Sequence, residues 1–263
     1  MSIGCAPAGS GNELAADTMD EAQRSAVPLG CPADVDLAVN PDFTFTRNDY
    51  YVCLAHEQSP IRGRVNKLVS SMYGARGLGT AAAPLMAARP DQVTLAVCGC
   101  GDSVFGTLTL GMDSDAGLLA DSLYRPQIDE LRAEGRRLCE VTRLVIDTEA
   151  RSAEVMATIF NVAFVLAKGL HARTDLVAEV HPRHAGFYQR TMGYRVAGPV
   201  RTCERVNAPA VLMHLCLDFA EQQIRQFAGN FARGDRSLYR LFLSQAEQEA
   251  LARQLLLPVA AVA

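Results

Sequence analysis

The segment CEVTRLVID, residues 139–147, places two ionisable side chains within a run of aliphatic and β-branched residues. Glu140 and Arg143 lie three positions apart in what reads as a β-strand covered on both faces. Charges in such a strand need partners or a function, because burying an unpaired charge is costly. A glutamate can take a proton from an amine, and the planar fork of an arginine suits a carboxylate. The pair therefore indicates either a structural ion pair or a site for acid–base chemistry and anion binding.

The regular alternation of a strand would turn Glu140 and Arg143 toward opposite faces of the sheet. A β-bulge between them would bring both side chains toward one side, and it would also splay the backbone and leave amides unpaired. Shared chemistry therefore requires an irregular strand, and we predict a sheet opened beside Arg143.

A second segment, VHPRHAGFYQRTMGY at residues 180–194, reads as a strand end that opens into a short helix. On that helix His184 and Tyr188 lie four positions apart on one face, and Phe187 can anchor the other side to the core. Tyr188 is a candidate acid, or alternatively a packed tyrosine with a bonded hydroxyl. His181 ends the strand, where it is either a base at neutral pH or a structural histidine before proline.

The elements that position these residues follow from periodicity and turn signals. The expected order is β α β β α β α β α β β, in which only the middle has the rhythm of parallel crossovers. This order predicts an α/β (α+β) fold with a mixed, mostly antiparallel sheet and helices on both faces. The expected strands include residues 50–55, a hairpin around 99–102, 138–147, 175–182, 194–200 and 209–217; the expected helices include one with its stripe at Ile61 to Met72, one between Pro126 and Gly135, one starting at Thr148 and Glu149, and one closed by Gly193.

Composition sets the domain limits. The chain has 263 residues, 49% of them hydrophobic, and a formal net charge of −4. Residues 1–40 hold six acidic residues and one arginine, so we expect a disordered acidic tail there. The core domain is expected over 41–217 and a helical C-terminal extension over 218–263.

Nothing indicates nucleic-acid binding, a metal site or a transmembrane segment, and the eight scattered cysteines suit reduced thiols in a cytoplasm.

The two segments together resemble a known family. FYQRTMGY resembles the F-Y-x-x-x-G-F segment that closes the acyl-donor groove of GNAT-fold acyltransferases, with one extra residue before the glycine. The E-x-x-R pattern of Glu140 and Arg143 is similar to that of acyl-homoserine-lactone synthases, and residues 107–147 resemble the FeeM-type N-acyl amino acid synthases. The resemblance covers about residues 50–218, and it implies a GNAT-like fold.

The resemblance also implies a bacterial N-acyltransferase. It would move a long-chain fatty acyl group from an acyl carrier protein thioester to the α-amine of an amino acid. The pantetheine arm would lie along the splayed strand end, with Leu144, Val145, Ile146 and Arg151 binding the donor. Glu140 would orient or deprotonate the amine, and Tyr188 or His181 would assist as acid or base. Arg143 and Tyr73 would bind the acceptor.

One departure bears on the donor. Acetyl-CoA-dependent GNAT enzymes carry Q/R-x-x-G-x-G/A after this strand, whereas this chain has Arg151-Ser-Ala-Glu154-Val-Met. The acid and the missing glycines favour a carrier-bound phosphopantetheine donor over free CoA, with no permanently bound cofactor. Two alternatives stay open: a homoserine-lactone synthase using S-adenosylmethionine, against which the absence of tryptophan counts, and a non-catalytic acyl-binding protein.

Overall fold

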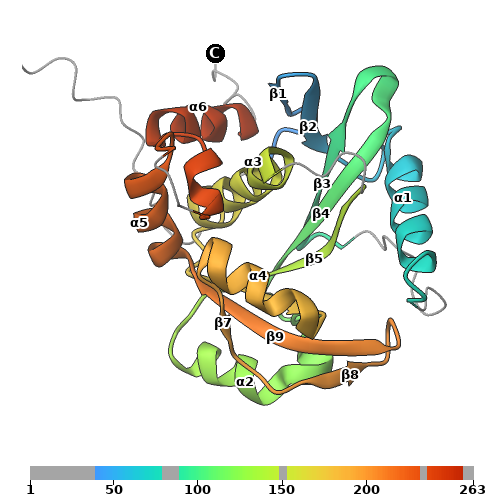
Figure 1. The fold of residues 1–263 in the computed structure, drawn as a ribbon, viewed down its shortest axis with the longest axis vertical. Helices are drawn as coiled ribbons and strands as arrows, with labels where there is room; N and C mark the ends of the chain where they lie inside the picture. Colours follow the sequence, from blue (N-terminus) through green and yellow to red (C-terminus); the bar gives the residue numbers. More distant parts are fainter. Residues whose placement is uncertain (1–38, 79–88, 148–152, 232–235, 257–263) are drawn as a thin grey trace, which may run out of the picture.

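The computed structural model describes residues 39–78, 89–147, 153–231 and 236–256. Its centre is a nine-stranded mixed sheet with helices on both faces, which confirms the predicted fold class (Figure 1). The strand order is β1-β2-β3-β4-β5-β6-β9-β7, and β8 pairs with β9 outside this path.

The first five strands are antiparallel, each to the next along the chain. They are β1 (Thr44–Arg47), β2 (Tyr50–Leu54), β3 (Gln92–Cys98), β4 (Val104–Met112) and β5 (Leu138–Ile146). The predicted hairpin around residues 99–102 is confirmed as β3 and β4. Strand β1 was not predicted, because its four residues carry no buried alternation.

The remaining strands complete the sheet beyond β5. Strand β6 (Asp175–Val180) runs parallel to β5, and β9 (Ala208–Cys216) runs antiparallel to β6. The strand expected at 194–200 is shorter, because β7 (Arg195–Val196) ends before Gly198 and Pro199, and proline cannot donate to a ladder. A further short strand, β8 (Arg201–Cys203), was missed.

One face of the sheet, called here the α1/α2 face, carries two helices. Helix α1 (Arg62–Gly74) packs on β4 and β5 through Val65 and Val69, and α2 (Asp121–Ala133) packs on β5, β6 and β9 through Tyr124 and Ile128. Helix α2 starts before the position predicted from Pro126. The backbone kinks at Tyr124 (φ −128°, ψ 28°), so the proline lies just after the kink, where its missing N–H is tolerated.

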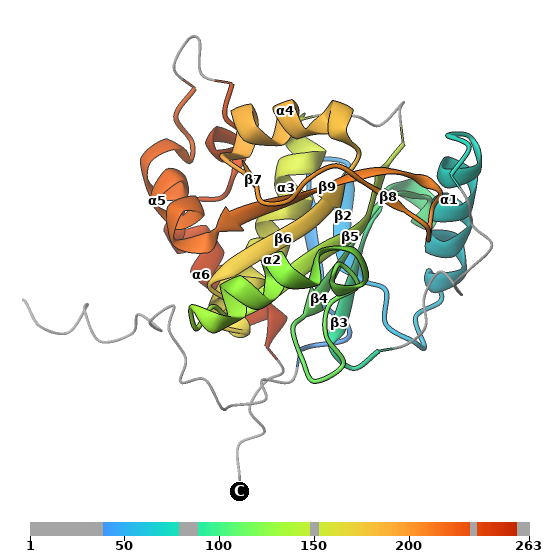
Figure 2. The ribbon, with the colours of Figure 1, turned by 90° about the horizontal axis from the view of Figure 1, so that it is seen from below.

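The opposite face carries the main hydrophobic core. It is covered by α3 (Ala153–Phe164), which continues as a π-helix over Val165–Leu170, and by α4 (Pro182–Met192), α5 (Leu217–Phe227), a 3₁₀ turn at Leu238–Leu241 and α6 (Gln245–Leu255). Figure 2 shows α4 and α2 on opposite sides of β6 and β9. The expected start of α3 at Thr148 and Glu149 lies outside the described residues.

The C-terminal helices share the main core with the sheet. Tyr239, Phe242, Leu251 and Leu255 are buried in the same cluster as β3 and β4. The predicted capping box at Ser244 is confirmed, with Glu247 at its N3 position. Residues 217–231 and 236–256 therefore pack as part of the same core.

One stretch has the length and apolar composition of a membrane span. It is Ala153–Leu170, the combined α3 and π-helix, and 72% of it is buried inside the protein. Such burial is typical of a core helix of a globular protein.

Helix α4 ends as predicted at Gly193, which adopts the left-handed conformation (φ 76°). A Cβ at this position would lie 2.3 Å from Cε1 of Phe219 on α5. We expect Gly193→Ala to lower the free energy of unfolding by at least about 1 kcal/mol, because alanine disfavours this conformation and the ring must move. Urea unfolding would measure the loss. The control is Gly74→Ala, since that Cβ meets nothing within 4 Å in α1, and equal stability of G193A and wild type would contradict the prediction.

Candidate active site

The site begins with an irregularity in β5. Between the pairs Thr109–Thr142 and Thr107–Val145, one residue of β4 faces two residues of β5, Arg143 and Leu144. Arg143 has φ 50°, a left-handed conformation that is uncommon for a residue other than glycine. This bulge confirms the prediction of an irregular strand beside Arg143, and it turns the arginine toward the α1/α2 face, where Gln92 lies.

The sheet opens next to this bulge. Strands β5 and β6 pair only from Leu138–Asp175 to Glu140–Val177, although both strands continue beyond. The edge of β5 that faces β6 over residues 141–146 therefore has no β6 partner in the ladder. Extended backbone with unpaired groups can accept a strand-like ligand. The predicted opening is confirmed, and Leu144, Val145 and Ile146 lie along it.

Glu140 lies at the last paired position and is buried, with 3% of its surface exposed. Its carboxylate accepts hydrogen bonds from the backbone N–H groups of Leu119 (2.8 Å) and Ala120 (3.1 Å). Burial raises the pKa of Glu140 to about 7, although these two hydrogen bonds oppose the rise. Glu140 thus fixes the loop before α2, and its carboxylate does not contact Arg143 as an ion pair.

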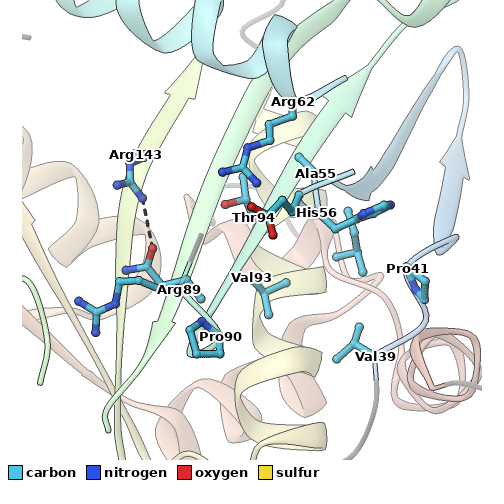
Figure 3. A pocket seen from close by; sticks show the side chains of 13 residues that line it. Val39, Pro41, Ala55, His56, Arg62, Arg89, Pro90, Val93, Thr94 and Arg143 are labelled. Carbon is cyan, nitrogen blue, oxygen red and sulfur yellow. Dashed lines mark hydrogen bonds between the residues drawn. The ribbon is translucent and has the colours of Figure 1, made fainter. Parts of the chain in front are cut away.

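Arg143 points into a cavity of about 480 Å³ (Figure 3). The cavity lies at the N-terminal end of β3, where β3 extends past the last residue of β2. Its guanidinium donates to Oε1 of Gln92 at 3.5 Å, and within the described ranges no carboxylate forms a salt bridge with it. Burial lowers the pKa of Arg143, and the positive charge is held beside a neutral amide. An unpaired, half-buried arginine is suited to bind an anionic ligand.

The rest of the cavity combines basic and apolar groups. Arg89 is fixed by Asp91 through two hydrogen bonds of 2.9 and 2.6 Å. Arg62 and His56 also line the cavity, and Glu57 is the one acidic lining residue among those described. The lining consists of Val39, Pro41, Leu54, Ala55, His56, Glu57, Arg62, Arg89, Pro90, Gln92, Val93, Thr94 and Arg143. This cavity can hold a small molecule with a carboxylate and an apolar part.

Tyr73, next to the last residue of α1, is not among the residues that line this cavity, but it lies close enough to Arg143 to feel its charge. Burial raises the pKa of its hydroxyl, and the charges of Arg143 and Arg76 oppose that rise. The structure therefore brings the two predicted acceptor-binding residues, Arg143 and Tyr73, near each other on the α1/α2 face.

Sequence reasoning missed a second acid beside the opening. Glu179 on β6 pairs with Arg205, which lies in the turn between β8 and β9. Arg205 also donates to the carbonyl oxygen of Leu119 at 2.7 Å, so it links Glu179 to the loop that Glu140 holds. Burial raises the pKa of Glu179. The available signal was an acid within the apolar strand DLVAEV, the same kind of signal that singled out Glu140.

Tyr188 and His181 lie on the α4 side. Burial raises the pKa of Tyr188 to about 12, opposed by the charge of Arg76 past the end of α1. Its ring packs against Phe187 and Tyr194. His181 caps α4, and its Nδ1 accepts a hydrogen bond from the backbone N–H of Arg183 at 3.2 Å. His181 thus serves as the N-cap of α4. The catalytic roles of His181 and Tyr188 remain predictions.

The start of α3 carries an acid where acetyl-CoA-dependent enzymes carry a glycine. Glu154 accepts a hydrogen bond from Nδ2 of Asn48 at 2.7 Å and lies 3.0 Å from Nε of Arg47. It therefore joins α3 to the hairpin of β1 and β2. Arg151, predicted to contact the donor, lies outside the described residues.

A mixed sheet whose one parallel pair parts beside a bulge, with helices on both faces, is the GNAT acyltransferase architecture. The model of the family "N-acyl amino acid synthase FeeM" matches residues 64–216, more than half of the chain. The protein therefore belongs to the FeeM N-acyl amino acid synthase family and is an N-acyltransferase.

The structure of FeeM shares the fold, and two further solved structures are similar over part of the chain. FeeM from uncultured soil microbes superposes with a TM-score of 0.59 at 23% identity, covering 66% of this chain and 93% of that one. A putative N-acetyltransferase from Lactobacillus plantarum gives a TM-score of 0.47 at 16% identity, covering 65% and 99%. The synthase LasI gives 0.46 at 14%, covering 64% and 90%. No curated protein matches the sequence.

Proposed function

We propose that this N-acyltransferase moves a long-chain fatty acyl group from an acyl carrier protein thioester to the α-amine of an amino acid. The observation that carries the proposal is the position of Arg143. It lies where β5 leaves β6, and its guanidinium reaches a cavity on the α1/α2 face. One residue thus borders both a groove for an extended donor and a pocket for an anionic acceptor.

The donor groove suits a phosphopantetheine arm. The arm would pair with the free edge of β5 over residues 141–146, as an added strand would. The side chain of Glu154, which pairs with Arg47, stands where a glycine would let the backbone approach the CoA phosphates, and this supports a donor without the CoA nucleotide. The long acyl chain and the carrier protein follow from the family resemblance, and this local chemistry supports the carrier.

The acceptor pocket suits an α-amino acid. The fork of Arg143 would bind the carboxylate in place of its weak contact with Gln92. The apolar lining from Leu54, Val93 and Pro90 would then contact the acceptor side chain. Tyr73 would complete the pocket from α1.

The acyl transfer needs donors for the oxyanion, a donor for the leaving sulfur and a group that orients the amine. The amine attacks the thioester carbonyl, the C–N bond forms, and the C–S bond breaks. Backbone N–H groups on the open edge of β5 at Leu144 to Ile146 would stabilise the oxyanion. Tyr188 stays protonated at neutral pH and would donate a hydrogen bond to the leaving thiolate. Glu140 is the predicted group for orienting the amine, acting through water because both its oxygens already accept hydrogen bonds.

A product assay tests this function. The protein, a long-chain acyl carrier protein and single amino acids should give N-acyl amino acids by mass spectrometry. Acyl-CoA of the same chain length is expected to be at least about tenfold poorer in kcat/KM, because side chains at positions 154 and 156 replace the glycines that would let backbone amides approach the phosphates. Glu154→Gly should narrow the difference in kcat/KM between the two donors. Equal use of both donors would refute the carrier preference, and no product with any acceptor would favour an acyl-binding protein.

A further inference from the structure

Two buried polar atoms beside the opening have no hydrogen-bond partner among the residues that the structure describes. They are Oγ1 of Thr142 on β5 and Oε1 of Glu179 on β6. Buried polar atoms in folded proteins are nearly always satisfied, so exceptions need an explanation such as a bound ligand. Thr142 and Glu179 lie on the two strands that separate at the opening, so one ligand in the opening can contact both atoms.

The register of β5 and β6 places the side chains of Thr142 and Glu179 at equivalent positions on the two strands. Glu140 pairs with Val177 in the parallel ladder, and two residues further along each strand lie Thr142 and Glu179. Both belong to the α1/α2 face, because side chains two residues apart share a face. Glu179 also pairs in register with Leu212, which packs against α2. Paired strands lie about 4.8 Å apart, and these two strands have just separated, so a single polar group fits between the side chains.

The chemistry of the two atoms selects the group. The other carboxylate oxygen of Glu179 is taken by Arg205, which leaves Oε1 as a pure acceptor. The Thr142 hydroxyl oxygen also accepts. A primary ammonium group satisfies both acceptors at once, because it has three N–H donors and its positive charge is favoured beside the Glu179 carboxylate.

The neighbouring residue supplies the complementary half of a zwitterion. Arg143 follows Thr142 directly, and its guanidinium is the carboxylate-binding group of the proposed function. We propose that Thr142 and Glu179 form the ammonium subsite of the acceptor, and that Glu179 accepts the proton that the nitrogen releases. This proposal rests on the proposed function and makes it specific, because it selects α-amino acids over other amines.

The proton balance is simple. The ammonium group gives one proton to Glu179, the free amine forms the C–N bond, and the C–S bond breaks with its electron pair on sulfur. The acylated nitrogen then loses a second proton to the departing thiolate, so the products are an amide, a thiol and a protonated Glu179. Glu140 is less suited than Glu179 to accept this proton, because both carboxylate oxygens of Glu140 already accept hydrogen bonds from backbone N–H groups. Burial raises the pKa of Glu179, which favours proton uptake.

The test uses the full chain, a long-chain acyl carrier protein and each amino acid in turn. We expect Thr142→Val to raise the acceptor KM about tenfold and to leave the donor KM within about twofold, because one hydrogen bond to a charged group is lost. Thr142→Ser, which keeps the hydroxyl, should restore the wild-type KM. Glu179→Gln should lower kcat at least about tenfold with amino acids.

A second acceptor separates proton transfer from structure. The nitrogen of aminooxyacetate is unprotonated at neutral pH, so it does not have to give a proton to Glu179 before it attacks. Wild type and E179Q should therefore use aminooxyacetate at rates within about threefold of each other. Equal losses on both acceptors, or an unchanged acceptor KM in T142V, would overturn the subsite alone. A wild-type protein that acylates no amino acid overturns the proposed function, and the subsite with it.

Discussion

Replacing Arg143 with alanine is expected to lower kcat/KM for the acceptor amino acid by on the order of 10²-fold, with most of the change in KM. The guanidinium has a neutral amide as its partner and borders the cavity, so binding a carboxylate there would form a charged pair in a partly buried site. Removing one member of such a pair costs about 2–5 kcal/mol. Steady-state kinetics with varied acceptor and saturating donor would measure the loss.

Arg143→Lys is the matched variant for this experiment. It keeps the positive charge and removes the planar fork, so an intermediate KM is expected. The donor KM should stay close to the wild-type value in both variants, because the donor binds along the backbone edge of β5. An acceptor KM that is unchanged in R143A would remove Arg143 from the acceptor pocket.

The stability of the wild-type protein is expected to fall by about 3 kcal/mol more than that of Glu140→Gln as pH rises from 4.5 to 7. Burial raises the pKa of Glu140 from 4.5 to about 7 in the folded protein. A carboxyl group with a raised pKa stabilises the fold while it is protonated, below pH 4.5. This contribution is lost as pH rises through the folded pKa, because the unfolded chain ionises more readily.

Urea unfolding at several pH values would measure this difference. A glutamine does not ionise, so the pH dependence of E140Q should lack this component. Its absolute stability will be lower, since an amide nitrogen would face the N–H group of Leu119 or Ala120. Parallel stability curves for the two proteins would contradict the raised pKa of Glu140.

The local parts of the fold could be predicted from the sequence. Gly193 after an amphipathic segment predicted the end of α4, and Ser244 with Glu247 predicted the cap of α6. The bulge at Arg143 followed from two charges on an otherwise apolar strand. Each of these signals lies within a few residues of the structure that it determines.

The contacts that complete the site could not be predicted in this way. Glu140 is bonded to backbone N–H groups, whose positions depend on the loop path and are independent of side-chain type. Glu179 and Arg205 are 26 residues apart and meet only because the turn between β8 and β9 folds over β6. The cavity exists because the N-terminal end of β3 extends beyond the last residue of β2. The relative lengths of these two strands depend on tertiary packing.

The separation between the donor groove and the acceptor cavity has a kinetic consequence. On the proposed function, the donor lies along the open edge of β5 and the acceptor carboxylate lies in the cavity, and the two places adjoin at Thr142 and Arg143. Both substrates can then be bound at once, and the acyl group passes directly between them without a covalent acyl-enzyme. Initial rates would follow a sequential order of addition, and the protein would retain no acyl label when the amino acid is withheld.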